Sequence, residues 1–343
     1  MFRDLDLPIV RTRCETNIGN VSGKGVDLLV GYRDKAGELS YDVSANAGFN
    51  TNRVTNLDGV ATDELYDGYN FYNNGNTSYG VMANKTLTIT KTGLPFGSFY
   101  GYKVTGMFKT DAEAAASPQA ANAHAGDLIF AHDPKNGSTL ASSDQQVIGN
   151  PNPKLIYGIN IRLSYKGFDL AALFKGVAGV QLFNGVKAYE QFPFVSDATT
   201  TTAALHDSYF GSNGLTSQPR MGITKSDGTF SFDPNGNYTS PNSYFVESGA
   251  YIKLKNLQVG YTFSDDLLRT VKIKSCRVFV MANNLFTITK YSGIDPEVGS
   301  AYSQAANSGY VGTSVGVTTR GLDAVSQYPQ TRIYSAGIDI NFQ

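Results

Sequence analysis

Strict alternation of apolar and polar residues is the feature of this sequence that most restricts its fold. From Leu39 to Asn50 every odd position is apolar and every even position is polar or glycine. The stretches Tyr157–Tyr165 and Tyr334–Phe342 alternate in the same way. Side chains of a β-strand point to opposite faces in turn, so this pattern predicts strands with one apolar and one polar face.

Weaker alternation extends the prediction to nine strands. Their approximate ranges are 26–33, 39–49, 86–92, 98–108, 157–165, 168–176, 251–263, 274–285 and 332–342. Within 251–263 the apolar phase changes near Lys255, which predicts a β-bulge at that residue.

The predicted connections alternate between short and long. Short ones lie at 34–38, 93–97, 166–167 and 264–273, whereas the others run for tens of residues rich in Gly, Ser, Asn, Thr and Tyr. Outer-membrane β-barrels join antiparallel strands by short periplasmic turns and long outer loops, and a soluble sandwich rarely carries such loops at one end. The pattern favours an all-β fold, an antiparallel transmembrane β-barrel segment. The alternative is a secreted β-sandwich that binds carbohydrate.

The barrel interpretation assigns each strand face to a solvent. The apolar faces would meet lipid, and the polar faces, with Asp42, Arg162, Asp169, Lys175 and Asp339, would line the lumen. The opposite assignment would place charges against hydrocarbon, at a cost of about 2–4 kcal/mol for a midplane Arg or Lys.

Composition excludes several other classes of protein. Lys plus Arg is 28 and Asp plus Glu is 29, so no net positive charge attracts nucleic acid. Apolar runs are too short for a helical membrane span. Cys14 and Cys276 show no disulfide framework or metal-ligand spacing.

A G-x-S-x-G match at 312–316 lies in a Gly/Ser/Thr loop rather than between a strand and a helix. We therefore expect that the protein is not an enzyme, and that it has no catalytic residue, no cofactor and no metal ion.

The odd strand count suggests that the chain belongs to something larger, because single-chain bacterial barrels have even counts. If the last strand ends on the periplasmic side, the first one descends from outside. We expect residues 1–343 to be the C-terminal part of a barrel, with its N-terminal strands absent.

Several segments resemble the SusC/RagA family of TonB-linked outer membrane transporters. They follow one another in the family's order over nearly the whole chain, and include Thr16–Val21, Pro95–Tyr102, Gly126–Leu128, Ile148–Lys154, Tyr165–Leu170, Tyr251–Leu257, Asn283–Thr287 and Gly293–Glu297. Relatives often carry a calcium-like loop after the Gly-Asp-Leu position, whereas here it reads His132 to Ser138 with a lysine among the would-be ligands.

The resemblance implies a 22-stranded barrel closed by an N-terminal plug domain, and we expect that domain to be absent from these 343 residues. Family members reside in the cell outer membrane and import glycans (oligosaccharides) or peptides with a SusD-type surface lipoprotein, using energy transmitted by TonB. TonB would act through the missing N-terminal part. The terminal aromatic Phe342 is implied to be the signal that the outer-membrane assembly machinery recognises, although Gln343 follows it.

One aromatic cluster is the candidate contact surface for a substrate or a lid protein. It contains Tyr66, Tyr69, Phe71, Tyr72 and Tyr79, interleaved with Asp67 and several asparagines. Aromatic faces next to amides suit sugar rings, whose C–H faces stack and whose hydroxyls form hydrogen bonds. The alternative is a loop packed on its own tyrosines, and similar clusters at 189–194 and 244–245 weaken the case for the first.

Overall fold

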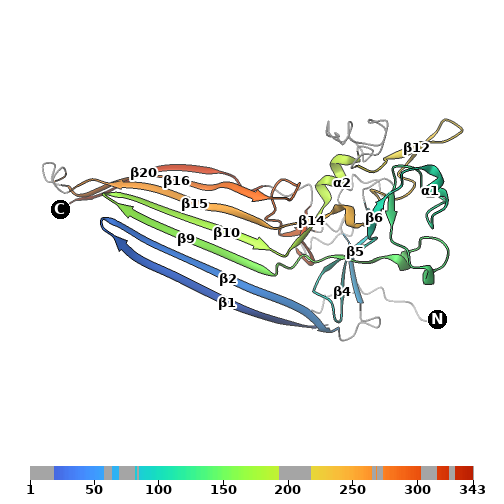
Figure 1. Ribbon diagram of the computed structural model, residues 1–343, viewed down its shortest axis with the longest axis horizontal. Helices are drawn as coiled ribbons and strands as arrows, with labels where there is room; N and C mark the ends of the chain where they lie inside the picture. The colour runs from blue at the N-terminus through green and yellow to red at the C-terminus, as the bar shows by residue number, and fades with distance from the viewer. Residues whose placement is uncertain are drawn as a thin grey trace, which may run out of the picture.

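A long curved sheet and a compact part at one of its ends make up the molecule (Figure 1). The computed structural model describes residues 19–57, 64–68, 82, 85–192, 218–264, 268, 273–302, 315–323 and 329–342. Among these residues, no helix is both long and apolar enough to cross a lipid bilayer.

Seven antiparallel strands form the long sheet, in the order in which they occur along the chain. They are β1 (Asn20–Ala36), β2 (Leu39–Asn56), β9 (Leu155–Tyr165), β10 (Phe168–Ala178), β15 (Tyr251–Thr262), β16 (Ile273–Thr289) and β20 (Ile333–Phe342). The connections β1–β2, β9–β10 and β15–β16 are short, and the three connections between them are long and build the compact part. The predicted alternation of short and long connections is confirmed for these seven strands.

Turn residues explain the tight hairpins. Lys166 and Gly167 both have positive φ, of 48° and 84°, as a two-residue type I′ turn requires. Gly37 has φ of 65° in the β1–β2 turn, where a residue without Cβ is not strained.

The register places one apolar row across the whole sheet. Residues directly opposite one another share a face, and this row takes one residue from each strand: Tyr32, Val43, Ile161, Ala172, Leu257, Ala282 and Tyr334. The polar row beside it begins with Arg33, Asp42 and Arg162. Val43 is 37% exposed and Ile338 is 64% exposed, so no second sheet covers the apolar face at these residues. The β-sandwich alternative is therefore wrong.

The β-bulge predicted near Lys255 is confirmed. The pairing of β15 with β10 and with β16 skips Lys255, since Leu254 and Asn256 are each paired and the register shifts between them. The shift returns Leu254 to the apolar face and turns Lys253 to the polar face, directly opposite Lys175 of β10.

Two of the nine predicted strands do not belong to the long sheet. Residues 86–92 form β4 (Thr86–Lys91), and 98–108 divide into β5 (Ser98–Gly101) and β6 (Val104–Met107), all within the compact part. Leu87, Thr88, Ile89 and Thr90 of β4 are all buried, so neither of its faces meets solvent or lipid. A six-residue strand is also too short to cross a barrel wall, which needs about 9–11 residues.

The compact part contains short elements from all three long connections. Besides β4, β5 and β6, these are β3 (Glu64–Gly68), α1 (Asp111–Ala115), β7 (Leu128–Phe130), η1 (Pro134–Asn136), η2 (Ser142–Asp144), β8 (Gln146–Gly149), β11 (Gln181–Asn184), α2 (Gly185–Gln191), β12 (Gly222–Thr224), β13 (Phe230–Phe232), η3 (Ser243–Phe245), β14 (Val246–Ser248), β17 (Ser300–Tyr302), β18 (Val315–Arg320) and β19 (Leu322–Asp323). Its main core includes Phe99, Phe183, Tyr238, Phe245 and Leu322, which come from all three connections. Packing of aromatic and aliphatic side chains therefore joins the long connections into one body.

Candidate functional site: the junction of sheet and loops

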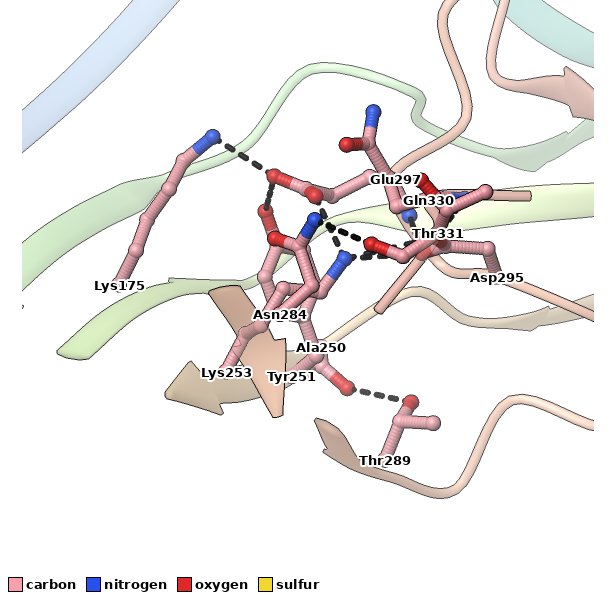
Figure 2. A network of polar contacts seen from close by, with 10 residues as sticks. All are labelled: Lys175, Ala250, Tyr251, Lys253, Asn284, Thr289, Asp295, Glu297, Gln330 and Thr331. Atoms are coloured by element: carbon pink, nitrogen blue, oxygen red, sulfur yellow. Dashed lines mark hydrogen bonds and ion pairs between the residues drawn. The ribbon is translucent and has the colours of Figure 1, made fainter. Parts of the chain in front are cut away.

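A charged network joins the polar face of the sheet to the last long connection, residues 290–332 (Figure 2). Lys175 and Lys253 lie directly opposite each other on neighbouring strands, an arrangement in which like charges repel. Glu297 lies between them: its Oε1 accepts from Lys175 Nζ at 2.8 Å and its Oε2 from Lys253 Nζ at 2.6 Å. The carboxylate thus turns a repulsive pair into two ion pairs.

Asp295 accepts hydrogen bonds from residues near both ends of the same connection. Lys253 Nζ lies 3.3 Å from its Oδ1, and this oxygen also accepts from the backbone N–H of Glu297 at 3.0 Å. Its Oδ2 accepts from the backbone N–H of Gln330 at 3.1 Å. One carboxylate therefore holds the start and the end of the connection above the polar face of the sheet.

Burial makes the network strong. The Lys253 side chain is 2% exposed, and Asp295 and Glu297 are 16% and 12% exposed. Burial opposes the ionisation of Glu297, but the contacts with Lys175 and Lys253 outweigh it and lower the pKa of Glu297 to about 2. Glu297 is therefore charged at neutral pH. The network contains no nucleophile paired with a base. It can instead fix the last long connection to the sheet.

A second ion-pair group lies on the polar face near the short turns. Arg277 of β16 donates to Asp169 of β10 through Nε at 2.9 Å and through Nη2 at 2.6 Å, and its Nη1 lies 3.4 Å from Asp339 of β20. The bidentate contact crosses β15 at Gly260, where a Cβ would lie 2.5 Å from Arg277 Nη2. The glycine leaves the space through which the pair forms.

Comparisons with known proteins agree with this architecture. The chain is 26% identical over 329 residues to TonB-dependent receptor P3 of Formosa agariphila, covering 95% of this chain and 29% of that protein. It is 23% identical over 330 residues to TonB-dependent receptor SusC of Bacteroides thetaiotaomicron, covering 95% of this chain and 27% of SusC. The chain is thus similar to TonB-dependent receptors, SusC among them. No protein-family model matches it.

Solved structures show the same fold. The structure of the RagAB peptide transporter superposes with a TM-score of 0.63 at 21% sequence identity, and covers 94% of this chain and 30% of the matched chain. The RagAB importer in its open-open state gives a TM-score of 0.62. The chain thus spans about three-tenths of the length of the proteins that it resembles.

The aromatic cluster proposed from the sequence lies mostly outside the described residues. Tyr66 is part of β3, whose backbone pairs with β4, but Tyr69, Phe71, Tyr72 and Tyr79 are not described. A contact role for this cluster therefore stays a prediction. The comparable residues at 192 and 244–245 have packing roles. Phe192 stacks on Tyr238, with 5.1 Å between the two ring centroids, and Phe245 is fully buried.

Phe342 lies at the end of β20, at the edge of the long sheet. Its register partner is Ile273 of β16, and it is 73% exposed. It shares a face with Ile338 and Ile340, as the alternation predicts. An assembly role for Phe342 stays a prediction.

The charged network is the part of the site that sequence reasoning did not find. Asp295 and Glu297 lie in a motif recognised only as a family resemblance, and nothing in the sequence says that it folds back onto a strand. The phase change near Lys255 was the available signal, because it places Lys253 beside Lys175. Within the described ranges, no three His, Cys, Asp or Glu side chains are grouped closely enough to hold a metal ion.

Proposed function

We propose that this chain forms the C-terminal part of the barrel wall of an outer-membrane, TonB-dependent nutrient importer. The observation that carries the proposal is the apolar row that crosses all seven strands, with exposed members such as Tyr32, Val43 and Tyr334, while charged side chains occupy the opposite face. Such a sheet suits lipid on one side and a water-filled lumen on the other. The plug domain and the remaining strands would come from other parts of the complete transporter.

We propose that the complete transporter takes up glycans or peptides together with a SusD-type surface lipoprotein. The similarity to SusC and to the RagAB peptide transporter supports this class of cargo and partner. TonB would supply energy through the N-terminal part. The compact part lies at the long-loop end of the sheet, where a surface partner and its cargo would arrive, and the Tyr66–Tyr79 cluster is the proposed contact surface there.

The test uses the complete transporter in its native host. Deletion of its gene should abolish energy-dependent uptake of either a labelled oligosaccharide pool or a labelled peptide pool, and co-purification from outer membranes should recover a SusD-type lipoprotein. Mass spectrometry of the retained cargo distinguishes glycans from peptides. Recovery of the protein outside the outer-membrane fraction, or unchanged uptake of both pools, would contradict the proposal.

We also propose that Phe342 acts in assembly. Removal of Phe342 and Gln343 from the complete transporter should lower its amount in the outer membrane more than it lowers transport per inserted molecule. If Phe342 were only one more membrane-facing aromatic, its loss would cost about 1.5–3 kcal/mol of burial. Pulse-labelling with membrane fractionation separates the two roles, since normal insertion kinetics would exclude the assembly role.

A further inference from the structure

The link between β7 and β8 folds around one buried carboxylate. Asp144 is fully buried, and its two oxygens accept hydrogen bonds from several parts of the link. Asp133 donates its backbone N–H at 3.0 Å, Ala141 its backbone N–H at 2.9 Å, and Asn136 its side-chain amide at 2.7 Å. The carboxylate therefore organises the whole stretch from 132 to 144.

His132 supplies a further contact to this carboxylate and shows which protonation state the link requires. Its Nδ1 lies 2.9 Å from Asp144 Oδ2, and its Nε2 lies 3.1 Å from the carbonyl oxygen of Gly137. Both partners are acceptors, and only the doubly protonated imidazolium donates from both nitrogens. The His132 side chain is 8% exposed, whereas Gly137 is exposed, so water can replace the contact with Gly137 when it is lost.

The charges around His132 favour its cationic form. The hydrogen bond to Asp144 raises the pKa of His132, and the contact with Gly137 and the charge of Asp133 act in the same direction against the effect of burial. Burial opposes the ionisation of Asp144, but its hydrogen bonds outweigh this and hold its pKa well below its usual range. The Tyr102 phenol interacts with the charge of Asp144, and Lys135 lies in η1 within the same link.

We propose that residues 132–144 form a proton-dependent clamp, in which the His132 imidazolium bridges Asp144 and Gly137 and releases Gly137 when it loses its proton. The clamp connects β7, which pairs with β6, to β8, which pairs with β5. Its release would therefore loosen the link between two small sheets of the compact part without breaking either sheet. This proposal stands on the contacts of His132 and does not require the proposed transport function.

The sign of the pH effect follows from the direction of the shift. A histidine whose pKa is higher in the folded protein stabilises the fold fully below its unfolded pKa, about 6.5, and this contribution is lost as pH rises through the folded value. Each pH unit between the two values corresponds to about a tenfold change in the local opening equilibrium. We therefore expect the clamp to be closed in mildly acidic solution and to open on the alkaline side.

Two mass-spectrometric measurements on the complete purified protein test the clamp. Deuterium exchange at the imidazole C2 position, followed against pH, reports the titration of individual histidines, and His132 should titrate above the ordinary histidine pKa of about 6.5. Backbone amide exchange of peptides covering 131–145, corrected for its intrinsic pH dependence, should lose protection as His132 deprotonates. Peptides covering β4 and β5 serve as the internal reference.

Two variants complete the test. His132→Gln keeps one donor but cannot titrate, so the pH-dependent loss of protection in 131–145 should disappear. His124→Gln is the matched control, because the His124 ring lies 3.3 Å from the carbonyl oxygen of Asn122, outside the 132–144 link, and it should behave as wild type. A His132 transition at or below about pH 6.5, the ordinary histidine value, or an unchanged pH response in His132→Gln, would overturn the proposal. If His132→Gln fails to fold, the C2 exchange of the wild-type histidines decides alone.

Discussion

Replacing Lys253 by methionine tests whether the buried network holds the last long connection on the sheet. Methionine keeps the length of the side chain but removes its charge, and leaves Asp295 and Glu297 as two buried acids beside a single cation, Lys175. Removing one partner of a buried ion pair typically costs about 3–5 kcal/mol. The loop should then detach from the wall while the strands remain paired.

The structure gives an independent magnitude. Glu297 has its pKa lowered from 4.5 to about 2, and at about 1.4 kcal/mol per pH unit this corresponds to roughly 3 kcal/mol of favourable interaction with its surroundings. Lys175 and Lys253 share this interaction, so the expected cost of Lys253→Met is taken from buried ion pairs, at about 3–5 kcal/mol, which predicts a loss of local protection of more than about 100-fold. Amide exchange of peptides covering 290–299 and 329–332 in the complete transporter measures this loss.

Lys175→Met is the matched control for this substitution. Lys175 also contacts Glu297, but its side chain is 45% exposed, and exposed ion pairs contribute only about 0–1 kcal/mol. It should therefore increase exchange of the same peptides less than Lys253→Met does. If Lys253→Met and Lys175→Met give equal exchange, or if neither exceeds wild type, the reasoning that burial makes Lys253 the main anchor is refuted.

The network should also weaken in acid. Because the pKa of Glu297 is lower in the folded protein, its contribution is present above the unfolded value of 4.5 and is lost as pH falls toward 2. Exchange of the 290–299 peptide should rise over this interval in wild type. In Glu297→Gln the rise should be smaller, and a rise equal to that of wild type would assign the acid response to another group.

Two further substitutions, each with a control, test the ion pair that crosses Gly260 and the assignment of the sheet faces. Gly260→Ala places a methyl group 2.5 Å from Arg277 Nη2 and should lower the heat-denaturation midpoint of the folded barrel, at a cost of about 1–3 kcal/mol for overpacking. Gly23→Ala, where a Cβ meets no atom within 4 Å, should not; equal effects would contradict the crossing at Gly260. Ile161→Arg on the apolar face should reduce folded protein in the outer membrane, at about 2–4 kcal/mol if the residue lies near the bilayer midplane. Asn160→Arg on the polar face is its control, and a greater loss in the control would reverse the faces.

Alternation predicted the long sheet because each of its strands separates two environments. Leu39–Asn50 and Tyr157–Tyr165 have one apolar and one polar face, and the register joins their apolar residues in continuous rows. Even the irregularity at Lys255 could be read from the phase of its neighbours, since a bulge must shift the side chains that follow it.

The same rule failed for β4 because alternation does not report what covers a face. Thr88 and Thr90 alternate with Leu87 and Ile89, as in a wall strand, yet all four are buried in the compact part. Thr90 Oγ1, for example, accepts from the backbone N–H of Gly97 at 3.2 Å. Hydroxyl groups satisfied by local hydrogen bonds fill a polar face that water or a lumen would otherwise occupy. Long-range ion pairs such as Lys253 with Glu297 leave no periodic signal at all.

The pairing of β11 with β19 has a consequence for the order of folding. These two strands are parallel, with Phe183 opposite Leu322, so segments about 140 residues apart must meet. Each hairpin of the long sheet forms from local contacts, whereas closure of a long loop carries a larger entropic cost and comes late. We therefore expect the strands to assemble one hairpin after another, and the compact part to reach its final packing only when the last long connection arrives. A kinetic intermediate with a protected sheet and an unprotected β11 would be the sign of this order.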